Sequence, residues 1–335
     1  MPLQETFSNR WLVAVLRCLS SVGSSPRLKA SATIPHATEL PCFGWKSLSF
    51  SVPTLISIHR HIFEGVFKHA GQLRNYDITK KEWVLRGDTV LYGRSQDLRM
   101  ALEYDMEQER QFDYSGLNMG QVVEHLAKFV SGIWQIHPFR EGNTRTTAVF
   151  TIKYLRSIGF DVTNHLFSMH SWYFRNALVR ANYQNIAKGV QRDTRFLVQF
   201  FRNLLMGEQN ELRNRYMLVN PPEELDAPSS TPASTPSSTP SSTPSSAGVP
   251  FTTDNENILR LVKAIGHRQL SVKEMLAAVG LKDRMNFMEY SLTPAITEGF
   301  VCLLYPDKPR HPRQKYLLTV KGSALYNELT NDASK

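Results

Sequence analysis

The sequence predicts a mainly helical protein whose two folded parts are joined by a low-complexity linker. Over residues 56–210, apolar side chains recur every three or four positions, which is the spacing of one face of a helix. Residues 228–247 are almost entirely Ser, Thr, Pro and Ala, which cannot build a core. Residues 254–330 then show three helical stretches followed by two short strand-like runs. We therefore expect a larger helical domain and a smaller α+β domain.

The composition is ordinary for a globular protein, but the charge favours anionic partners. Hydrophobic residues make up 41% and charged residues 21%, with a net charge of +9 and a pI near 9.4. Such a surface attracts nucleotides, nucleic acid or acidic protein faces. Cys18, Cys42 and Cys302 are too widely spaced for a disulfide framework or a zinc ribbon. Their spacing predicts a reducing compartment, which we take to be the cytoplasm. No apolar run in the sequence is long enough to span a membrane.

Residues 1–54 are predicted to be an atypical, poorly ordered N-terminal extension. The first fifty residues hold two acidic residues, five basic residues and many serines. The apolar run that starts at Trp11 is interrupted by Arg17, so it is too short for a secretory signal. An organellar transit peptide has a similar composition, but we favour an extension or an altered start that replaced native helices.

The larger domain, residues 55–210, opens with a predicted helix that begins at Ile56 and stops at Gly71. The helical stripe consists of Ile58, Ile62, Phe63, Val66, Phe67 and Ala70. Two short apolar runs then flank Arg86–Thr89, a pattern that predicts a β-hairpin. The hairpin residues are Trp83, Val84, Leu85, Val90, Leu91 and Tyr92.

Five further helices are predicted in this domain from their caps and apolar spacing. The first follows Ser95 and carries Leu98, Leu102 and Met106. The second has Val122 in its apolar stripe and ends at His137. The third follows the motif, has Val149 in its stripe and stops at Gly159. The last two are expected to be capped by Ser171 and Asp193, and the second of these ends at Gly207.

The linker, residues 211–250, separates this domain from residues 251–335. Since a Ser/Thr/Pro chain is semi-stiff and cannot transmit a packed interface, we expect two independent modules. In the second module, helices over Ile258–Ile265, Ser271–Gly280 and Phe287–Ile296 precede paired strands at 300–305 and 314–319. Three helices followed by a two-stranded wing predict a winged helix-turn-helix domain.

Duplex DNA is the predicted partner of this second domain. Arg284 and Asn286 lie early in its third helix, where a recognition helix meets base edges. In winged helices, basic residues on the wing contact the DNA phosphates. The predicted wing contacts are Lys308, Arg310, Arg313 and Lys315. Asp283 and Glu289 make the third helix less basic, so a protein-binding role is the alternative.

The segment His137-Pro-Phe-Arg-Glu-Gly-Asn-Thr-Arg145 joins the end of one predicted helix to the start of the next. It matches His-Pro-Phe-x-(Asp/Glu)-Gly-Asn-x-Arg at every fixed position, and so resembles the signature of the Fic (Fic/Doc) family. The resemblance covers residues 55–210 and implies a Fic helical core with the hairpin as its target-docking flap. It also implies a protein adenylyltransferase, in which a Tyr, Thr or Ser hydroxyl of a target protein attacks the α-phosphate of ATP.

The residues of the segment suit that chemistry. Backbone N–H groups at the start of a helix bind anions, which assigns phosphate contacts to Gly142, Asn143 and Thr144. Arg145 can grip a phosphate with its forked guanidinium. Glu141 can hold a Mg²⁺ that bridges phosphate oxygens, and His137 can act as general base. The resemblance further places Tyr183 near the adenine of ATP.

The chain departs from the family pattern at two positions of the motif helix. Many AMP-transferring members have Gly where Thr144 stands, and the kinase-like Doc members have Lys there. Many members also carry a second Arg three residues after the first, where this chain has Ala148. That Arg contacts the γ-phosphate, so the departure bears on ATP affinity and on the choice of nucleotide.

The family's self-inhibitory motif matches only at Thr252–Asn257, beyond the linker. We interpret this match as an ordinary helix N-cap. Inhibition is then either absent or left to a separate inhibitor protein. Two alternatives to AMP transfer stay open: a kinase or other nucleotidyl-transfer Fic variant, and a DNA-binding regulator with a weakly active Fic domain.

Overall fold

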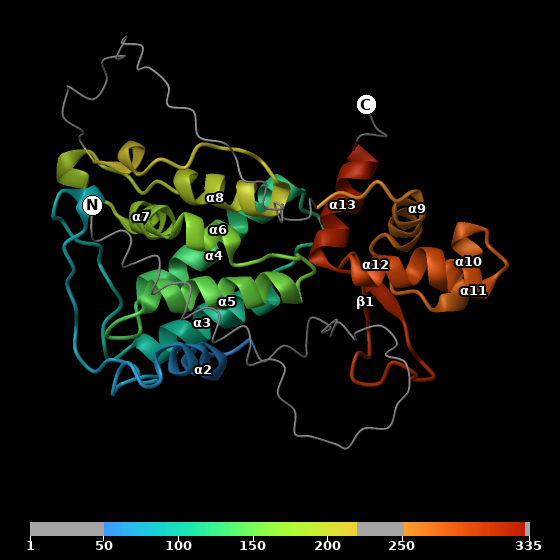
Figure 1. The fold of residues 1–335 in the computed structure, drawn as a ribbon, viewed down its shortest axis with the longest axis horizontal. Coiled ribbons are helices and arrows are strands. Elements are labelled where there is room, and N and C mark those ends of the chain that lie inside the picture. The colour runs from blue at the N-terminus through green and yellow to red at the C-terminus, as the bar shows by residue number, and fades with distance from the viewer. Residues whose placement is uncertain (1–49, 220–250, 332–335) are drawn as a thin grey trace, which may run out of the picture.

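The computed structural model describes residues 50–219 and 251–331 (Figure 1). Most of the predicted N-terminal extension and of the linker lies outside these residues, as do Cys18 and Cys42. The described chain is mainly helical, as the sequence predicts. In these two ranges no helix is both long and apolar enough to cross a membrane.

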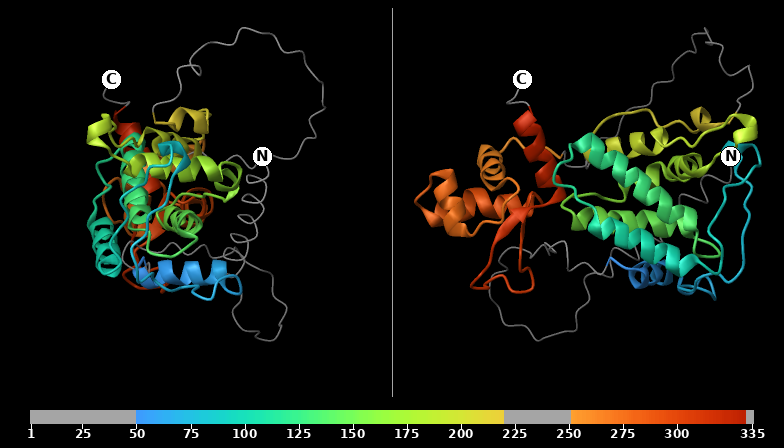
Figure 2. Two further views of the ribbon diagram at one scale, coloured as in Figure 1. Left: turned by 90° about the vertical axis from the view of Figure 1, so that its left-hand side faces the viewer. Right: turned by 180° about the vertical axis from the view of Figure 1, so that it is seen from behind.

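The first described range folds around a central helix, α4 (Met119–Ile136). It packs against α3, α5, α7 and α8, while α2 lies against α5 (Figures 1 and 2). The helices around it are α2 (Val52–Phe63), α3 (Leu98–Gln111), α5 (Asn143–Ser157), α6 (His165–Met169), α7 (Ser171–Asn182) and α8 (Arg195–Met206). Three short 3₁₀ turns complete the range: η2 (Trp83–Leu85), η3 (Ile186–Lys188) and η4 (Asn214–Met217).

Helix α4 ends where the sequence predicts. Asn118 and Gln121 form a reciprocal capping box at its start, which satisfies two backbone N–H groups. Its apolar stripe, which includes Val122, Leu126 and Ile133, is buried. The helix stops because His137 adopts a left-handed conformation with φ 51°. The predicted second and third helices of the motif region are therefore confirmed as α4 and α5.

Other predicted boundaries are wrong in detail. Helix α2 begins before Ile56 and ends at Phe63, because Gly65 turns the chain with φ 76° and leaves Val66 60% exposed. Helix α3 follows Asp97, not Ser95. The buried cluster also includes Phe50 and Met217, so packing extends on both sides of the predicted 55–210 boundary.

The predicted β-hairpin over residues 83–92 is wrong. Val84 and Leu85 are both buried although they are adjacent, whereas a half-buried strand alternates its side chains between two faces. The structure resolves this pattern with the 3₁₀ turn η2, followed by left-handed φ angles of 55° at Arg86 and 90° at Gly87. Residues 80–93 form a loop, and the one strand ladder in the described residues lies in the second range.

The second range follows the predicted order of three helices and two strands. Its elements are α9 (Glu256–Ile265), α10 (Val272–Val279), α11 (Arg284–Phe287), η6 (Met288–Leu292, a π-helical turn), α12 (Thr293–Thr297), β1 (Val301–Leu303), β2 (Tyr316–Leu318) and α13 (Val320–Asn331). Strands β1 and β2 are antiparallel, with Cys302 opposite Leu317, and Leu270 bridges to Tyr316. The Asn255 side chain accepts the N–H groups of Asn257 and Ile258, which confirms the N-cap interpretation of Thr252–Asn257.

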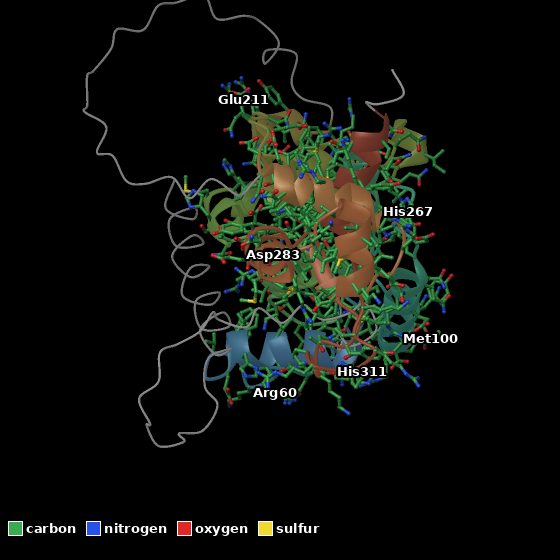
Figure 3. All side chains as sticks on the ribbon, turned by 90° about the vertical axis from the view of Figure 1, so that its right-hand side faces the viewer. Arg60, Met100, Glu211, His267, Asp283 and His311 are labelled. Atoms are coloured by element: carbon green, nitrogen blue, oxygen red, sulfur yellow. The ribbon has the colours of Figure 1, made fainter. Side chains whose placement is uncertain are left out.

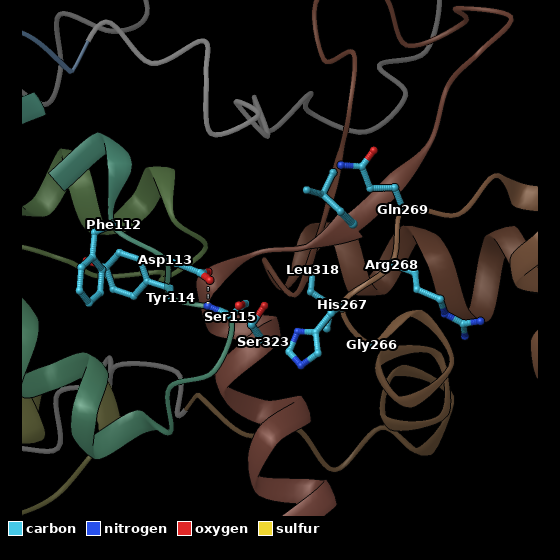
Figure 4. A pocket seen from close by; sticks show the side chains of 11 residues that line it. Phe112, Asp113, Tyr114, Ser115, Gly266, His267, Arg268, Gln269, Leu318 and Ser323 are labelled. Atoms are coloured by element: carbon cyan, nitrogen blue, oxygen red, sulfur yellow. Dashed lines mark hydrogen bonds between the residues drawn. The ribbon is translucent and has the colours of Figure 1, made fainter. Parts of the chain in front are cut away.

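The two ranges pack together through α13, which the sequence did not predict. Val320 and Ala324 belong to the buried cluster of the first range, and the Asn327 amide donates to the carbonyls of Ser115 and Leu117 at 2.8 Å each. A small cavity of about 220 Å³ remains between the ranges, with Asp113 on one side and His267 on the other (Figure 4). The expectation that the linker rules out a packed interface is therefore wrong.

Candidate active site

His137 lies buried at the C-terminal end of α4, with 1% of its surface exposed. Its Nδ1 is 3.2 Å from the carbonyl oxygen of Trp134, so Nδ1 carries the ring proton and donates it there. Nε2 is then the nitrogen with a lone pair for an incoming proton. Burial, followed by the charges of Lys80 and Arg175, holds the pKa of His137 well below 6.5. The imidazole is thus a neutral base at physiological pH.

Arg74 fixes the backbone on which His137 sits. Its guanidinium donates to the carbonyls of His137 (2.8 Å), Ile136 (3.3 Å), Tyr76 (2.7 Å) and Gly93. Its own backbone N–H donates to the Pro138 carbonyl at 2.9 Å. The side chain is buried, so these carbonyls replace the water it has lost. Sequence analysis did not identify this role, because His137 and Ile136 lie 63 and 62 positions from Arg74.

His59 holds the other end of the motif loop. The Gly71 N–H donates to its Nδ1 at 2.8 Å, so the proton sits on Nε2 and is donated to the Glu141 carbonyl at 3.0 Å. The ring stacks on Phe139, with centroids 3.8 Å apart and planes 10° apart. Burial lowers the pKa of His59 to about 4. Both ring nitrogens are used, so His59 is a structural histidine.

The predicted phosphate residues divide into side chains that build the loop and backbone that faces outward. The Asn143 side chain bonds to both the N–H and the carbonyl of Phe139, which closes the loop. The Thr144 hydroxyl accepts the indole N–H of Trp134 at 3.0 Å. Their side chains are therefore committed, and the predicted phosphate contact is left to the first N–H groups of α5, which have no partner within the helix.

Gly142 stands at the N-terminus of α5 with φ 80°. A Cβ atom built there would lie 2.2 Å from Cε2 of Phe63, so even alanine does not fit. The same Phe63 ring lies under the Arg145 guanidinium at 4.6 Å. Ala148, one turn further along α5, is fully buried. Arg145 is therefore the cation that α5 itself brings to this edge of the site.

Glu141 is exposed, and its carboxylate lies 3.5 Å from the ammonium of Lys80. In the described parts of the chain, no three His, Cys, Asp or Glu residues cluster as a metal site. One exposed carboxylate nevertheless fits Mg²⁺, which binds through one or two carboxylates together with substrate phosphates and water. The donor set suits a metal that arrives with a nucleotide, but not a metal held by the protein alone.

Tyr183 lies beside the 80–93 loop rather than on the motif. Its hydroxyl donates to Asp88 at 2.7 Å, and Lys188 pairs with the same carboxylate at 3.2 Å, so that the pKa of Asp88 falls to about 2. These side chains line a pocket of about 430 Å³. The loop is anchored by buried Glu82, which binds Arg175 through both oxygens and accepts the Tyr92 hydroxyl.

Half of the predicted docking residues do not reach the surface. Val84, Leu85 and Val90 are buried, so their side chains do not offer contacts to a target protein. Trp83 and Leu91 are 49% and 82% exposed, and Tyr92 lies next to the His137 ring with centroids 4.3 Å apart. Trp83 and Leu91 are therefore the exposed apolar side chains of this loop.

The predicted DNA residues belong to the second range, which faces the viewer in Figure 3, where Asp283 and His311 are labelled. Asp283 caps α11, and its carboxylate also accepts the side-chain amide of Asn286. The remaining predicted contacts are Arg284, at the start of α11, and Lys308, Arg310, Arg313 and Lys315, between β1 and β2. Lys308, Arg310 and Arg313 are exposed, but so are the apolar Met285 and Tyr290.

Comparison with family models matches both ranges. Residues 49–155 match the model described as Fic/DOC family, and residues 256–319 match the model described as Filamentation induced by cAMP protein Fic-like, C-terminal domain. The first match contains α2, the 80–93 loop and the complete motif.

Two curated relatives carry the name "Probable protein adenylyltransferase Fic". The protein from Escherichia coli (strain K12) is 26% identical and that from Salmonella typhimurium (strain LT2) 29% identical, each over 160 residues, 47% of this chain and 76% of the relative. Among solved structures, Bartonella tribocorum BepC with bound AMPPNP is 16% identical, with a TM-score of 0.41 over 60% of this chain and 86% of that one. That likeness is too loose to show a shared fold by itself.

The fit of Gly142 against Phe63 can be tested with alanine. Gly142→Ala should destabilise the protein more than the matched control Gly65→Ala. Both glycines have positive φ, but nothing lies within 4 Å of a Cβ at position 65. The shared left-handed strain is about 1–2 kcal/mol, and overpacking adds about 1–3 kcal/mol at position 142 only. Equal losses in chemical denaturation would show that Phe63 moves aside freely.

Proposed function

Since the chain belongs to the Fic/DOC family, we propose that it transfers AMP from ATP to a Tyr, Thr or Ser hydroxyl of a target protein. The observation that carries this proposal is the buried His137 at the end of α4, whose Nδ1 donates to the Trp134 carbonyl, in the same short motif as the N-terminus of α5. The names of the two curated relatives agree with it.

The reaction needs a base on one side of the α-phosphate and anion binding on the other. Nε2 of His137 takes the proton of the attacking hydroxyl as the new bond from oxygen to the α-phosphorus forms. The bond from that phosphorus to the bridging oxygen breaks, and pyrophosphate leaves. Backbone N–H groups of α5 and the Arg145 guanidinium hold the phosphates in place. Mg²⁺, bound with ATP and held by Glu141, would supply charge neutralisation at the phosphate oxygens.

Two surfaces at the 80–93 loop are assigned to the substrates. We assign the adenine to the pocket at Tyr183 and Asp88, in line with the sequence prediction. The target protein is assigned to the exposed Trp83 and Leu91 side chains and the adjoining backbone of the 80–93 loop. A separate inhibitor protein and a cytoplasmic setting are further predictions from the sequence.

The environment of Thr144 favours AMP transfer over the kinase alternative. Its side chain is buried and bonded to Trp134, so position 144 offers the nucleotide only its backbone N–H, as a glycine would. The Doc type places a lysine at this position, which would add a cation. We therefore keep the kinase as the second choice.

Duplex DNA is the partner proposed for the second range. The order of α9, α10 and the α11–α12 segment before β1 and β2 agrees with a winged helix-turn-helix. Three exposed cations on the loop between the strands suit phosphates. Exposed Met285 and Tyr290 on the third helical segment favour the alternative of a bound protein.

The AMP-transfer proposal predicts the fate of the radiolabel. Incubation with Mg²⁺ and ATP should label protein from α-labelled but not from γ-labelled ATP. His137→Ala should lower this rate by about 10² to 10⁴, the contribution of a general base, while nucleotide binding persists. The rates are read by autoradiography of the chain itself and of a lysate. Label from γ-labelled ATP alone would instead establish a kinase.

The pH dependence follows from the neutral state of His137. Because the base works unprotonated and its pKa is lowered, kcat should stay level from pH 8 down past 6.5 and fall only at lower pH. Lys80→Gln removes a neighbouring positive charge, raises the pKa of His137, and should move this fall to higher pH. Transfer rates at saturating ATP and Mg²⁺ measure both. A fall centred at or above pH 6.5 in the unaltered protein would contradict the assignment.

DNA binding predicts a salt dependence carried by the loop between β1 and β2. Arg310→Ala with Arg313→Ala should flatten the slope of log affinity against log salt by about two units. Arg260→Ala with Lys263→Ala removes the same charge from α9 and should leave the slope unchanged. Fluorescence anisotropy of a labelled duplex with the whole protein measures both. If no binding occurs at low salt, the range is a protein-docking unit.

A further inference from the structure

Lys80 brings a second cation to the catalytic end of the site. Its ammonium is 3.5 Å from the Glu141 carboxylate and, after burial, is the strongest influence on the pKa of His137. Its backbone N–H bonds to the Thr89 hydroxyl at 3.3 Å, which ties the start of the 80–93 loop to its far arm.

Lys80 is also the nearby cation whose partner is most easily exchanged. Lys80, Arg175 and Arg74 are the three cations that act on His137. Arg74 is buried and donates to four backbone carbonyls, and Arg175 binds both oxygens of buried Glu82. Lys80 instead faces a carboxylate that is 61% exposed, and pairs of that kind contribute little.

The departing pyrophosphate requires a cation beside it, and Lys80 can supply one. Members of the family with a second arginine carry it at the position of Ala148, which is fully buried here. Arg145 is held over the Phe63 ring at the start of α5. Pyrophosphate gains negative charge as its bond to the α-phosphorus breaks, and a cation placed at that charge stabilises the transition state.

We propose that the Lys80 ammonium contacts the β- and γ-phosphates of ATP and stabilises the departing pyrophosphate, in place of an arginine at position 148. This role rests on the proposed AMP transfer. Glu141 would hold a Mg²⁺ that arrives with the nucleotide, which would leave the Lys80 ammonium available to the phosphates. The ammonium then pairs with the phosphates, and the bridging oxygen leaves with the electron pair of its bond to the α-phosphorus. The hydroxyl proton remains on His137.

The test compares two fragments of ATP as ligands. Magnesium pyrophosphate and AMP are titrated by calorimetry into the full-length protein, Lys80→Ala, Lys80→Arg and the control Lys81→Ala. Lys81 is the exposed neighbour of Lys80 and carries the same charge. Lys80→Ala should weaken pyrophosphate binding about 10- to 100-fold, the loss expected for one charge-assisted contact, and leave AMP binding unchanged. Lys80→Arg should retain most of the affinity, and Lys81→Ala all of it.

Each other outcome overturns the role. An equal loss for AMP and pyrophosphate would make Lys80 a structural residue of the loop. Unchanged pyrophosphate binding in Lys80→Ala, or the same loss in Lys81→Ala, would show that position 80 has no specific contact. The calorimetric titrations measure binding and need no turnover. If the α-label experiment fails, AMP transfer is rejected, but the pyrophosphate and AMP affinities are unaffected by that result.

Discussion

The hydrogen bonds of Arg74 to the end of α4 are the constraint on which the candidate site depends. A buried guanidinium is costly unless its donors are satisfied, and here backbone carbonyls from three segments satisfy them. Two of those carbonyls, at Ile136 and His137, belong to the C-terminal end of a helix, where the dipole favours a cation. Arg74 thereby pins the left-handed turn at His137 and contributes to lowering the pKa of that histidine.

Two buried histidines of lowered pKa flank the motif, and hydrogen bonding separates their roles. His59 accepts a hydrogen bond at Nδ1 from the Gly71 N–H and donates one from Nε2 to the Glu141 carbonyl, so backbone groups engage both ring nitrogens. His137 has a bond at Nδ1 alone within the described part of the chain. Burial and pKa therefore do not distinguish a scaffold histidine from a base. What distinguishes His137 is that its Nε2 makes no hydrogen bond within the described part of the chain.

The sequence was most informative where local rules decide the structure. The stop of α4 at His137 and the start of α5 beyond Gly142 follow from spacing and caps, and the motif identifies the chemistry they frame. Arg74 and Lys80 escaped notice because their partners at His137 and Glu141 are some sixty positions away. The hairpin failed because burial of both Val84 and Leu85 is decided by tertiary packing, which alternating apolar runs do not reveal.

The packing of the two ranges against each other was not predicted either, because it also depends on contacts between residues far apart in the sequence. Gly159 and Gly299 approach so closely that a Cβ on either would lie 2.4 Å or less from the carbonyl oxygen of the other. The linker between them carries no trace of this contact. Helix α13 contacts the first range at the start of α4 and at the end of α5. The opposite ends of α4 and α5 are joined by the motif. The spacing between the second range and the candidate site is thus set by two rigid helices, and the length and composition of the linker have no part in it.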